Sequence, residues 1–83
     1  MADVEFYGAD WCSDCRRSKS LLNTLGVEYE MFDVEADPQA AEKSKEISGR
    51  TNIPVIRFAD GQHLVEPSDA VLHAELKLRG IIA

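Results

Sequence analysis

The feature that most constrains the fold of this chain is a pair of cysteines, Cys12 and Cys15, placed where one sequence periodicity gives way to another. Residues 4–8 are rich in strand-forming side chains and end in a glycine, which predicts a strand that stops just before the cysteines. From residue 12 to 25 small and apolar side chains recur at helical spacing, and Gly26 signals the helix end. The cysteine pair therefore opens a helix directly after a strand.

A second strand and a second helix follow. Residues 27–34 begin with strict alternation of apolar and polar side chains, which predicts a strand with one partly exposed face. Asp37 and Pro38 then open a helix that ends near Gly49, because Asp accepts hydrogen bonds from free N–H groups and Pro fits where no N–H is needed. Right-handed crossover of a strand-helix-strand unit makes the strands at 4–8 and 27–34 parallel.

The last third of the chain predicts a hairpin and a helix. Residues 55–59 form an apolar strand, and the Asp-Gly pair at 60–61 before residues 62–65 is a hairpin signal, so these two strands are expected to be antiparallel. Residues 67–69, Pro-Ser-Asp, supply a capping side chain and an acidic first turn for the last helix. The predicted order is βαβαββα, an α/β fold with a mixed four-stranded sheet covered by helices on both faces.

Length and charge limit what such a chain can do. At 83 residues it has room for one hydrophobic core, so we expect a single domain over residues 1–83. A net charge of -6 argues against binding to nucleic acid or to an anionic membrane surface. No apolar stretch approaches the roughly 18 residues that span a bilayer, and the first residues lack a signal-peptide pattern. We expect a cytoplasmic monomer, and in that compartment paired cysteines indicate redox or metal chemistry.

The spacing of the cysteines favours redox chemistry with unequal roles. Three positions apart on a helix, the two sulfurs share a face and can approach bonding distance. Cys12 at the first turn is the expected nucleophile, because free N–H groups and the positive end of the helix dipole stabilise a thiolate there. Cys15, one turn further in, suits a resolving thiol. Asp10 and Asp14 disfavour the Cys12 thiolate, which favours a reducing over an oxidising dithiol.

Two structural explanations for the cysteines fit less well. A zinc site would need two further ligands, but His63 and His73 are ten positions apart and lack the spacing of a zinc motif. Both histidines are expected to be exposed polar side chains. A purely structural disulfide would close a loop too short to constrain the unfolded chain strongly. We therefore predict no metal site.

Several motifs in this chain resemble those of glutaredoxins, which belong to the thioredoxin superfamily. They extend over residues 3–79 and are Tyr7-Gly8-Ala9-Asp10-Trp11-Cys12-Ser13-Asp14-Cys15, Ile53-Pro54, Asp60-Gly61 and Pro67-Ser68-Asp69. The Ala-Asp-Trp sequence before Cys12 and the shortness of the chain are most similar to the actinobacterial mycoredoxin branch. The resemblance implies a thioredoxin-like fold and a thiol-disulfide oxidoreductase.

The resemblance also implies roles for individual residues. Cys12 would be the nucleophile and Cys15 the resolving thiol, and the peptide bond between Ile53 and Pro54 would be cis. The backbone of Ile53 would face the cysteines and pair with a substrate segment. The substrate-binding residues that follow from the resemblance are Trp11, Asn52, Ile53, Pro54, Ser68 and Asp69. Ser68 and Asp69 can serve at the same time as helix caps.

The co-substrate implied by the resemblance is a low-molecular-weight thiol, mycothiol or glutathione, with no tightly bound cofactor. Glutaredoxins that use glutathione usually carry a Lys shortly before the first cysteine, where this chain has Asp10. The usual Gly-Gly before the last helix is replaced by residues 64–67, Leu-Val-Glu-Pro. An acidic rim suits a neutral, sugar-bearing thiol such as mycothiol, or a protein disulfide, better than glutathione.

Two other functions stay open at the level of sequence. The first is a redoxin reduced by thioredoxin reductase that donates electrons to ribonucleotide reductase. Such proteins typically carry an aromatic, glycine-rich and proline-rich segment near the last helix, which residues 62–68 do not show. The second is a binding module in which Cys12 and an external thiol from each of two protomers hold an iron-sulfur cluster. Cys15 and Trp11 weigh against this second function.

Overall fold

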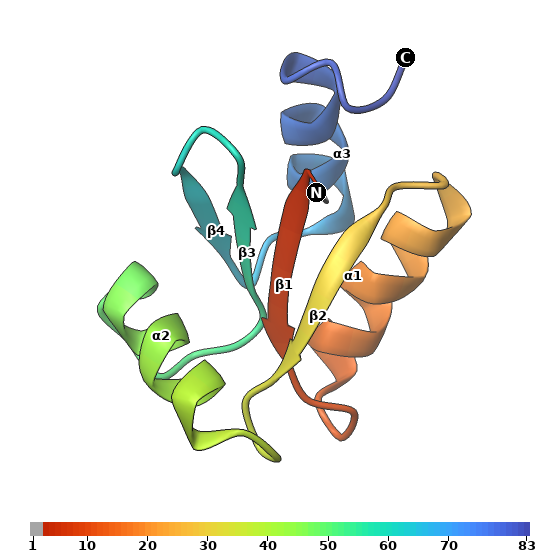
Figure 1. Ribbon diagram of the computed structural model, residues 1–83. Helices are drawn as coiled ribbons and strands as arrows, with labels where there is room; N and C mark the ends of the chain where they lie inside the picture. The colour runs from red at the N-terminus through yellow and green to blue at the C-terminus, as the bar shows by residue number, and fades with distance from the viewer. Residues whose placement is uncertain (1–2) are drawn as a thin grey trace.

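The elements of the chain follow the predicted order βαβαββα (Figure 1). The computed structural model describes residues 3–83. Its strands are β1 (Val4–Gly8), β2 (Tyr29–Asp33), β3 (Val55–Phe58) and β4 (His63–Val65), and its helices are α1 (Ser13–Thr24), α2 (Pro38–Ser48) and α3 (Asp69–Leu78).

The four strands form one mixed sheet with the order β2-β1-β3-β4. β1 and β2 are parallel, as the strand-helix-strand pattern predicted, and their register runs from Val4 opposite Tyr29 to Gly8 opposite Asp33. β3 is antiparallel to both β1 and β4. The carboxyl ends of β1 and β2 therefore meet at one end of the sheet, where α1 begins, and ligands of open α/β sheets bind at such an end.

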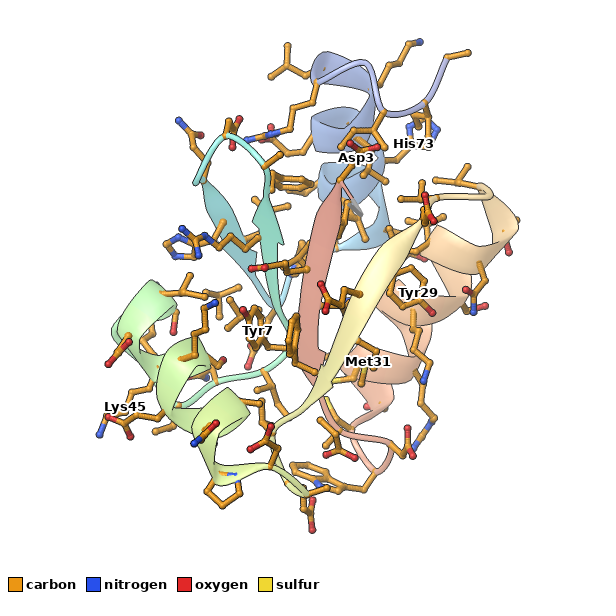
Figure 2. All side chains as sticks on the ribbon, in the orientation of Figure 1. Asp3, Tyr7, Tyr29, Met31, Lys45 and His73 are labelled. Carbon is orange, nitrogen blue, oxygen red and sulfur yellow. The ribbon has the colours of Figure 1, made fainter. Side chains whose placement is uncertain are left out.

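Helices cover both faces of the sheet, which confirms the predicted layers. α1 and α3 contact each other on one face, and α2 covers the other face (Figure 1). Because side chains alternate along a strand, Phe6 joins the core beneath α1 and α3, whereas Tyr7 points to the opposite face and stacks on Phe32. Figure 2 shows Tyr7 on the α2 side of the sheet and Tyr29 and Met31 on the α1 side. The buried residues of the main core are Val4, Phe6, Cys15, Leu22, Val27, Ile56, Phe58, Leu72 and Leu76.

The predicted start and stop signals act at the ends of the helices and in the hairpin. Asp37 is the residue before α2, and its carboxylate accepts a hydrogen bond from the N–H of Gln39 at 2.9 Å. Gly61 has a φ of 87° in the β3–β4 turn, a conformation that favours glycine. Within residues 3–83, no helix is both long enough and apolar enough to cross a membrane.

The structure differs from the sequence prediction mainly at the second strand. The alternating pattern covered residues 27–34, but β2 pairs with β1 only over Tyr29–Asp33. Val27 is buried in the loop, and its N–H donates to the carbonyl of Leu22 at the end of α1. An apolar side chain can thus be buried beside a strand without belonging to it, and alternation alone does not separate the two cases.

Candidate active site

Cys12 caps the amino terminus of α1. Its backbone is extended, and its sulfur accepts a hydrogen bond from the backbone N–H of Cys15, with an N to Sγ distance of 3.3 Å. Cys12 thus occupies the position where a Ser or Asp oxygen usually satisfies a free N–H group of a helix. A thiolate at this position gains from that N–H and from the positive end of the helix dipole. The side chain is half-buried, so a substrate can reach it.

Cys15 lies one turn further along α1 and is buried, with 2% of its surface exposed. Burial, together with a side-chain hydrogen bond between the two thiols, raises the pKa of the Cys15 thiol to about 12. At neutral pH Cys15 is therefore a neutral thiol. The two sulfurs are not bridged. The unequal exposure expected from their positions in the helix is present in the structure.

Gly8, the last residue of β1, lies directly against Cys15. A Cβ atom at residue 8 would be 2.9 Å from the Cys15 sulfur and 2.7 Å from a ring carbon of Phe6, closer than such atoms approach in proteins. Any residue other than glycine at position 8 would displace the Cys15 sulfur. The sequence predicted that Gly8 ends the strand but did not reveal this contact. A glycine at the end of a buried strand, just before a cysteine pair, was the available signal of close approach.

Ile53 and Pro54 approach the cysteines from the segment before β3. The peptide bond between them is cis, as the resemblance implied, and Pro54 is buried. The carbonyl oxygen of Ile53 lies 4.0 Å from the Cys12 sulfur. The backbone of Ile53, far from Cys12 in the sequence, therefore lies beside the Cys12 sulfur.

An open groove of about 360 Å³ lies beside Cys12. Its walls come from the start of α1, the segment before β3 and the residue after β4. Trp11 is 66% exposed at its edge, and its ring N–H donates to the carboxylate of Glu35. The lining residues are Trp11, Cys12, Asp14, Thr51, Asn52, Ile53 and Glu66. Trp11, Asn52 and Ile53 are among the substrate-binding residues that the resemblance implies, whereas nothing in the sequence points to Thr51 or Glu66.

The groove is lined by two carboxylates, Asp14 and Glu66, and none of its lining residues is Lys, Arg or His. Asp14 is paired with Arg17 at 3.1 Å, and Asp10, just outside the groove, lies 3.6 Å from the Lys19 ammonium. The acidic rim predicted from Asp10 and Asp14 therefore extends to the other wall of the groove through Glu66.

Ser68 and Asp69 lie at the start of α3 and do not line this groove. The Ser68 hydroxyl accepts a hydrogen bond from the N–H of Val71 at 3.2 Å, as expected of a capping residue. Asp69 pairs with Arg17 at 3.3 Å, and Arg17 also donates to the carbonyl of Pro67 at 2.8 Å. Arg17 thus joins the starts of α1 and α3. A ligand contact at Ser68 or Asp69 stays a prediction.

The histidines stand apart from the cysteines. His63 in β4 and His73 in α3 are both exposed, and Figure 2 labels His73 on the outer side of α3. Across residues 3–83, no group of three or more His, Cys, Asp and Glu side chains is arranged to hold a metal ion.

Comparison with known sequences relates this site to a family. The model of the glutaredoxin family matches residues 4–64. The chain is 38% identical to Mycoredoxin 1 of Corynebacterium glutamicum over 79 residues, which cover 93% of this chain and 96% of that protein. It is also 38% identical to Glutaredoxin 3 of Escherichia coli over 64 residues, which cover 77% of this chain and 76% of that protein.

Solved structures share the fold. The crystal structure of a glutaredoxin from Archaeoglobus fulgidus superposes with a TM-score of 0.79 at 28% identity, over 89% of this chain and 85% of the other. The solution structure of glutaredoxin from Brucella melitensis superposes with a TM-score of 0.73 at 31% identity, over 99% of this chain and 89% of the other. The chain therefore belongs to the glutaredoxin family and is a thiol-disulfide oxidoreductase with a thioredoxin-like fold.

Proposed function

We propose that the protein reduces protein disulfides and mixed disulfides through Cys12 as the nucleophile and Cys15 as the resolving thiol, with a low-molecular-weight thiol as the electron source. The observation that carries this proposal is the asymmetry of the two sulfurs. Cys12 is open to the groove and accepts the N–H of Cys15 at 3.3 Å, whereas Cys15 is 2% exposed and has a pKa of about 12.

The first step is attack of the Cys12 thiolate on one sulfur of the substrate disulfide. A bond forms between that sulfur and Cys12, the disulfide bond breaks, and the second substrate sulfur leaves as a thiolate that takes a proton from water. The Cys15 N–H stabilises the attacking sulfur. The Ile53 carbonyl, 4.0 Å from Cys12, offers the backbone acceptor for an N–H of a substrate segment in the groove.

The second step can follow either of two routes. In one, Cys15 attacks the Cys12 sulfur and releases the remaining substrate thiol, which leaves a disulfide between Cys12 and Cys15. Cys15 is buried, and burial raises the pKa of its thiol, so Cys15 must lose a tightly held proton before it can attack. In the other route, an external thiol resolves the mixed disulfide on Cys12. The buried Cys15 supports the external route for small mixed disulfides.

The charges of the groove support a neutral thiol as the electron source. Glutathione carries two carboxylates, and the groove beside Cys12 is lined by Asp14 and Glu66 without a cation among its lining residues. The likeness to Mycoredoxin 1 over 93% of the chain also favours mycothiol over glutathione. The proposed site of action is the cytoplasm, where dithiols stay reduced, and the proposed active form is a monomer.

The test compares Cys15→Ser with Cys12→Ser. Each variant and the unmodified protein are given the mixed disulfide of a peptide with mycothiol or with glutathione, together with the matching free thiol. We expect Cys15→Ser to keep turnover, with a larger rate for mycothiol and a mycothiol adduct on Cys12 seen by intact mass. Cys12→Ser differs by the same single atom and is expected to lose turnover entirely.

The same assay includes thioredoxin reductase as an alternative electron source. Faster reduction by thioredoxin reductase than by either thiol would contradict the proposed electron source. Turnover that survives in Cys12→Ser would contradict the assignment of the nucleophile. Loss of all turnover in Cys15→Ser would show instead a carrier that works only through its dithiol.

A further inference from the structure

Glu66 has an unusual backbone conformation next to the groove. Among residues 3–83, it is the one non-glycine residue with a positive φ, at 49°. The left-handed conformation brings a Cβ atom too close to the backbone and is unfavourable for a side chain of this kind. Outliers of this kind cluster at functional sites, where surrounding structure holds them in place.

The hairpin holds Glu66 beside the cysteines. Its backbone N–H donates to the carbonyl of Pro54 at 2.9 Å, which extends the β3–β4 pairing one residue beyond the Val55–Val65 pair. Pro54 follows Ile53, whose carbonyl lies 4.0 Å from the Cys12 sulfur. Main-chain hydrogen bonding to the neighbouring strand therefore fixes the position of residue 66, which is not part of a free loop.

The side chain of Glu66 lies in the groove. One oxygen of its carboxylate accepts a hydrogen bond from the amide nitrogen of Asn52 at 3.1 Å, and both residues line the groove with Cys12. A carboxylate has two oxygens and about four acceptor sites, so the Asn52 contact fixes its direction and leaves acceptor capacity unused. The groove therefore presents an oriented negative charge to a substrate.

This charge is not neutralised by the protein. Within residues 3–83, no salt bridge involves Glu66, whereas Asp14 on the opposite wall is paired with Arg17 at 3.1 Å. No lining residue of the groove is a cation. Of the two carboxylates next to Cys12, Glu66 is therefore the one whose charge a substrate encounters uncompensated.

We propose that Glu66 is a specificity-determining residue that favours disulfides carrying a positive charge next to the reacting sulfur and disfavours those carrying a carboxylate there. In protein substrates the favoured group is a lysine or arginine side chain close to the cysteine. The inference rests on the proposed function, because it takes Cys12 as the attacking sulfur. Glu66 does not take part in the exchange of bonds and acts on the charge of the approaching substrate.

The test measures how fast the reduced protein reacts with three small symmetrical disulfides of similar size. These are cystamine, which is cationic, hydroxyethyl disulfide, which is neutral, and dithiodipropionic acid, which is anionic. Trp11 is the single tryptophan and lies in the groove, so its fluorescence follows the reaction in one turnover without any choice of reductant. Intact mass verifies the adduct on Cys12. The quantity compared is the ratio of the cationic to the anionic rate constant at low salt.

We expect a ratio well above one in the unmodified protein and a roughly fivefold lower ratio in Glu66→Gln, the range of an exposed charge pair. Glu66→Gly also removes the carboxylate, suits the positive φ, and is expected to lower the ratio equally. The matched control is Glu28→Gln, because Glu28 is exposed and adjoins β2 at the opposite end of the sheet from Cys12. Its ratio is expected to equal that of the unmodified protein.

Several outcomes would overturn the inference. An unchanged ratio in both Glu66 variants would show that the carboxylate does not select substrates. A ratio that falls equally in Glu28→Gln would show that net charge, not position, is responsible. If the unmodified protein reacted with none of the three disulfides, including the neutral one, the proposed function itself would be wrong, and the inference would fall with it.

Discussion

The buried floor of the site, which contains Cys15, and the exposed rim of the groove beside Cys12 differ in how tightly they are packed. The floor, formed by Phe6, Gly8 and Cys15, is buried and so closely packed that one added carbon would lie 2.9 Å from a sulfur. The rim, formed by Asn52 and Glu66, is exposed and polar. It is held by the hydrogen bond between these two side chains and by the backbone N–H of Glu66, which donates to the carbonyl of Pro54. The floor fixes the position of the Cys15 sulfur. The rim, as proposed above, selects the substrates that reach Cys12.

The largest effect is expected at the floor, from Gly8→Ala. The added methyl group would overlap Phe6 and the Cys15 sulfur, and overpacking of this kind costs about 1–3 kcal/mol of unfolding free energy. Denaturation by urea measures the loss. The same substitution in a Cys15→Ala background is the control, because it removes the sulfur that the new methyl group meets. We expect Gly8→Ala to cost less there, and an equal cost in both backgrounds would show that Cys15 is not the obstacle.

The second prediction concerns the pH dependence of stability that the buried floor imposes. Burial raises the pKa of Cys15 from its ordinary 9.0 to about 12, so the folded protein holds this proton more tightly than the unfolded chain does. The stability contributed by the neutral thiol is complete below pH 9 and is lost as pH rises from 9 towards 12. Unfolding of the fully reduced protein should therefore become easier across this range, as measured by urea midpoints at successive pH values.

Tyr7 contributes with the same sign, and variants separate the two groups. Burial raises the pKa of Tyr7 from 10.0 to about 12, so its part of the loss begins one pH unit later. Cys15→Ser is expected to remove the loss that begins near pH 9, and Tyr7→Phe the loss that begins near pH 10. A Cys15→Ser profile identical to that of the unmodified protein would contradict the assignment.

The floor and the rim also differ in how far sequence predicts them. The βαβαββα order followed from signals carried by neighbouring residues, such as the Asp37-Pro38 helix start and the glycine in the hairpin. The placement of Cys12 and Cys15 on one helix needed only their spacing and the helical pattern. Local signals therefore sufficed for the elements and for the cysteine pair.

The contacts around the cysteines depend on segments that are distant in sequence. The Asn52–Glu66 hydrogen bond exists because the hairpin register brings position 66 beside Pro54. The bond between Trp11 and Glu35 depends on the path of the chain after β2. The approach of Gly8 to Cys15 depends on how α1 packs against β1. None of these distances is encoded in a local pattern, so the sequence predicted an acidic rim but not Glu66, the carboxylate in the groove that no salt bridge neutralises within residues 3–83.

The smallest expected effect belongs to the rim, from Glu66→Gly. Glycine adopts a φ of 49° without the steric cost that a Cβ atom adds, but it also makes the unfolded chain more flexible. These terms oppose each other, and we expect a gain of up to about 1 kcal/mol in unfolding free energy, measured by urea denaturation. Glu66→Ala keeps the Cβ atom and loses the same carboxylate, so it is the matched control and should show no gain. Equal stability of the two variants would mean that Glu66 is not strained, and that its place on the rim rests on the hairpin and Asn52 alone.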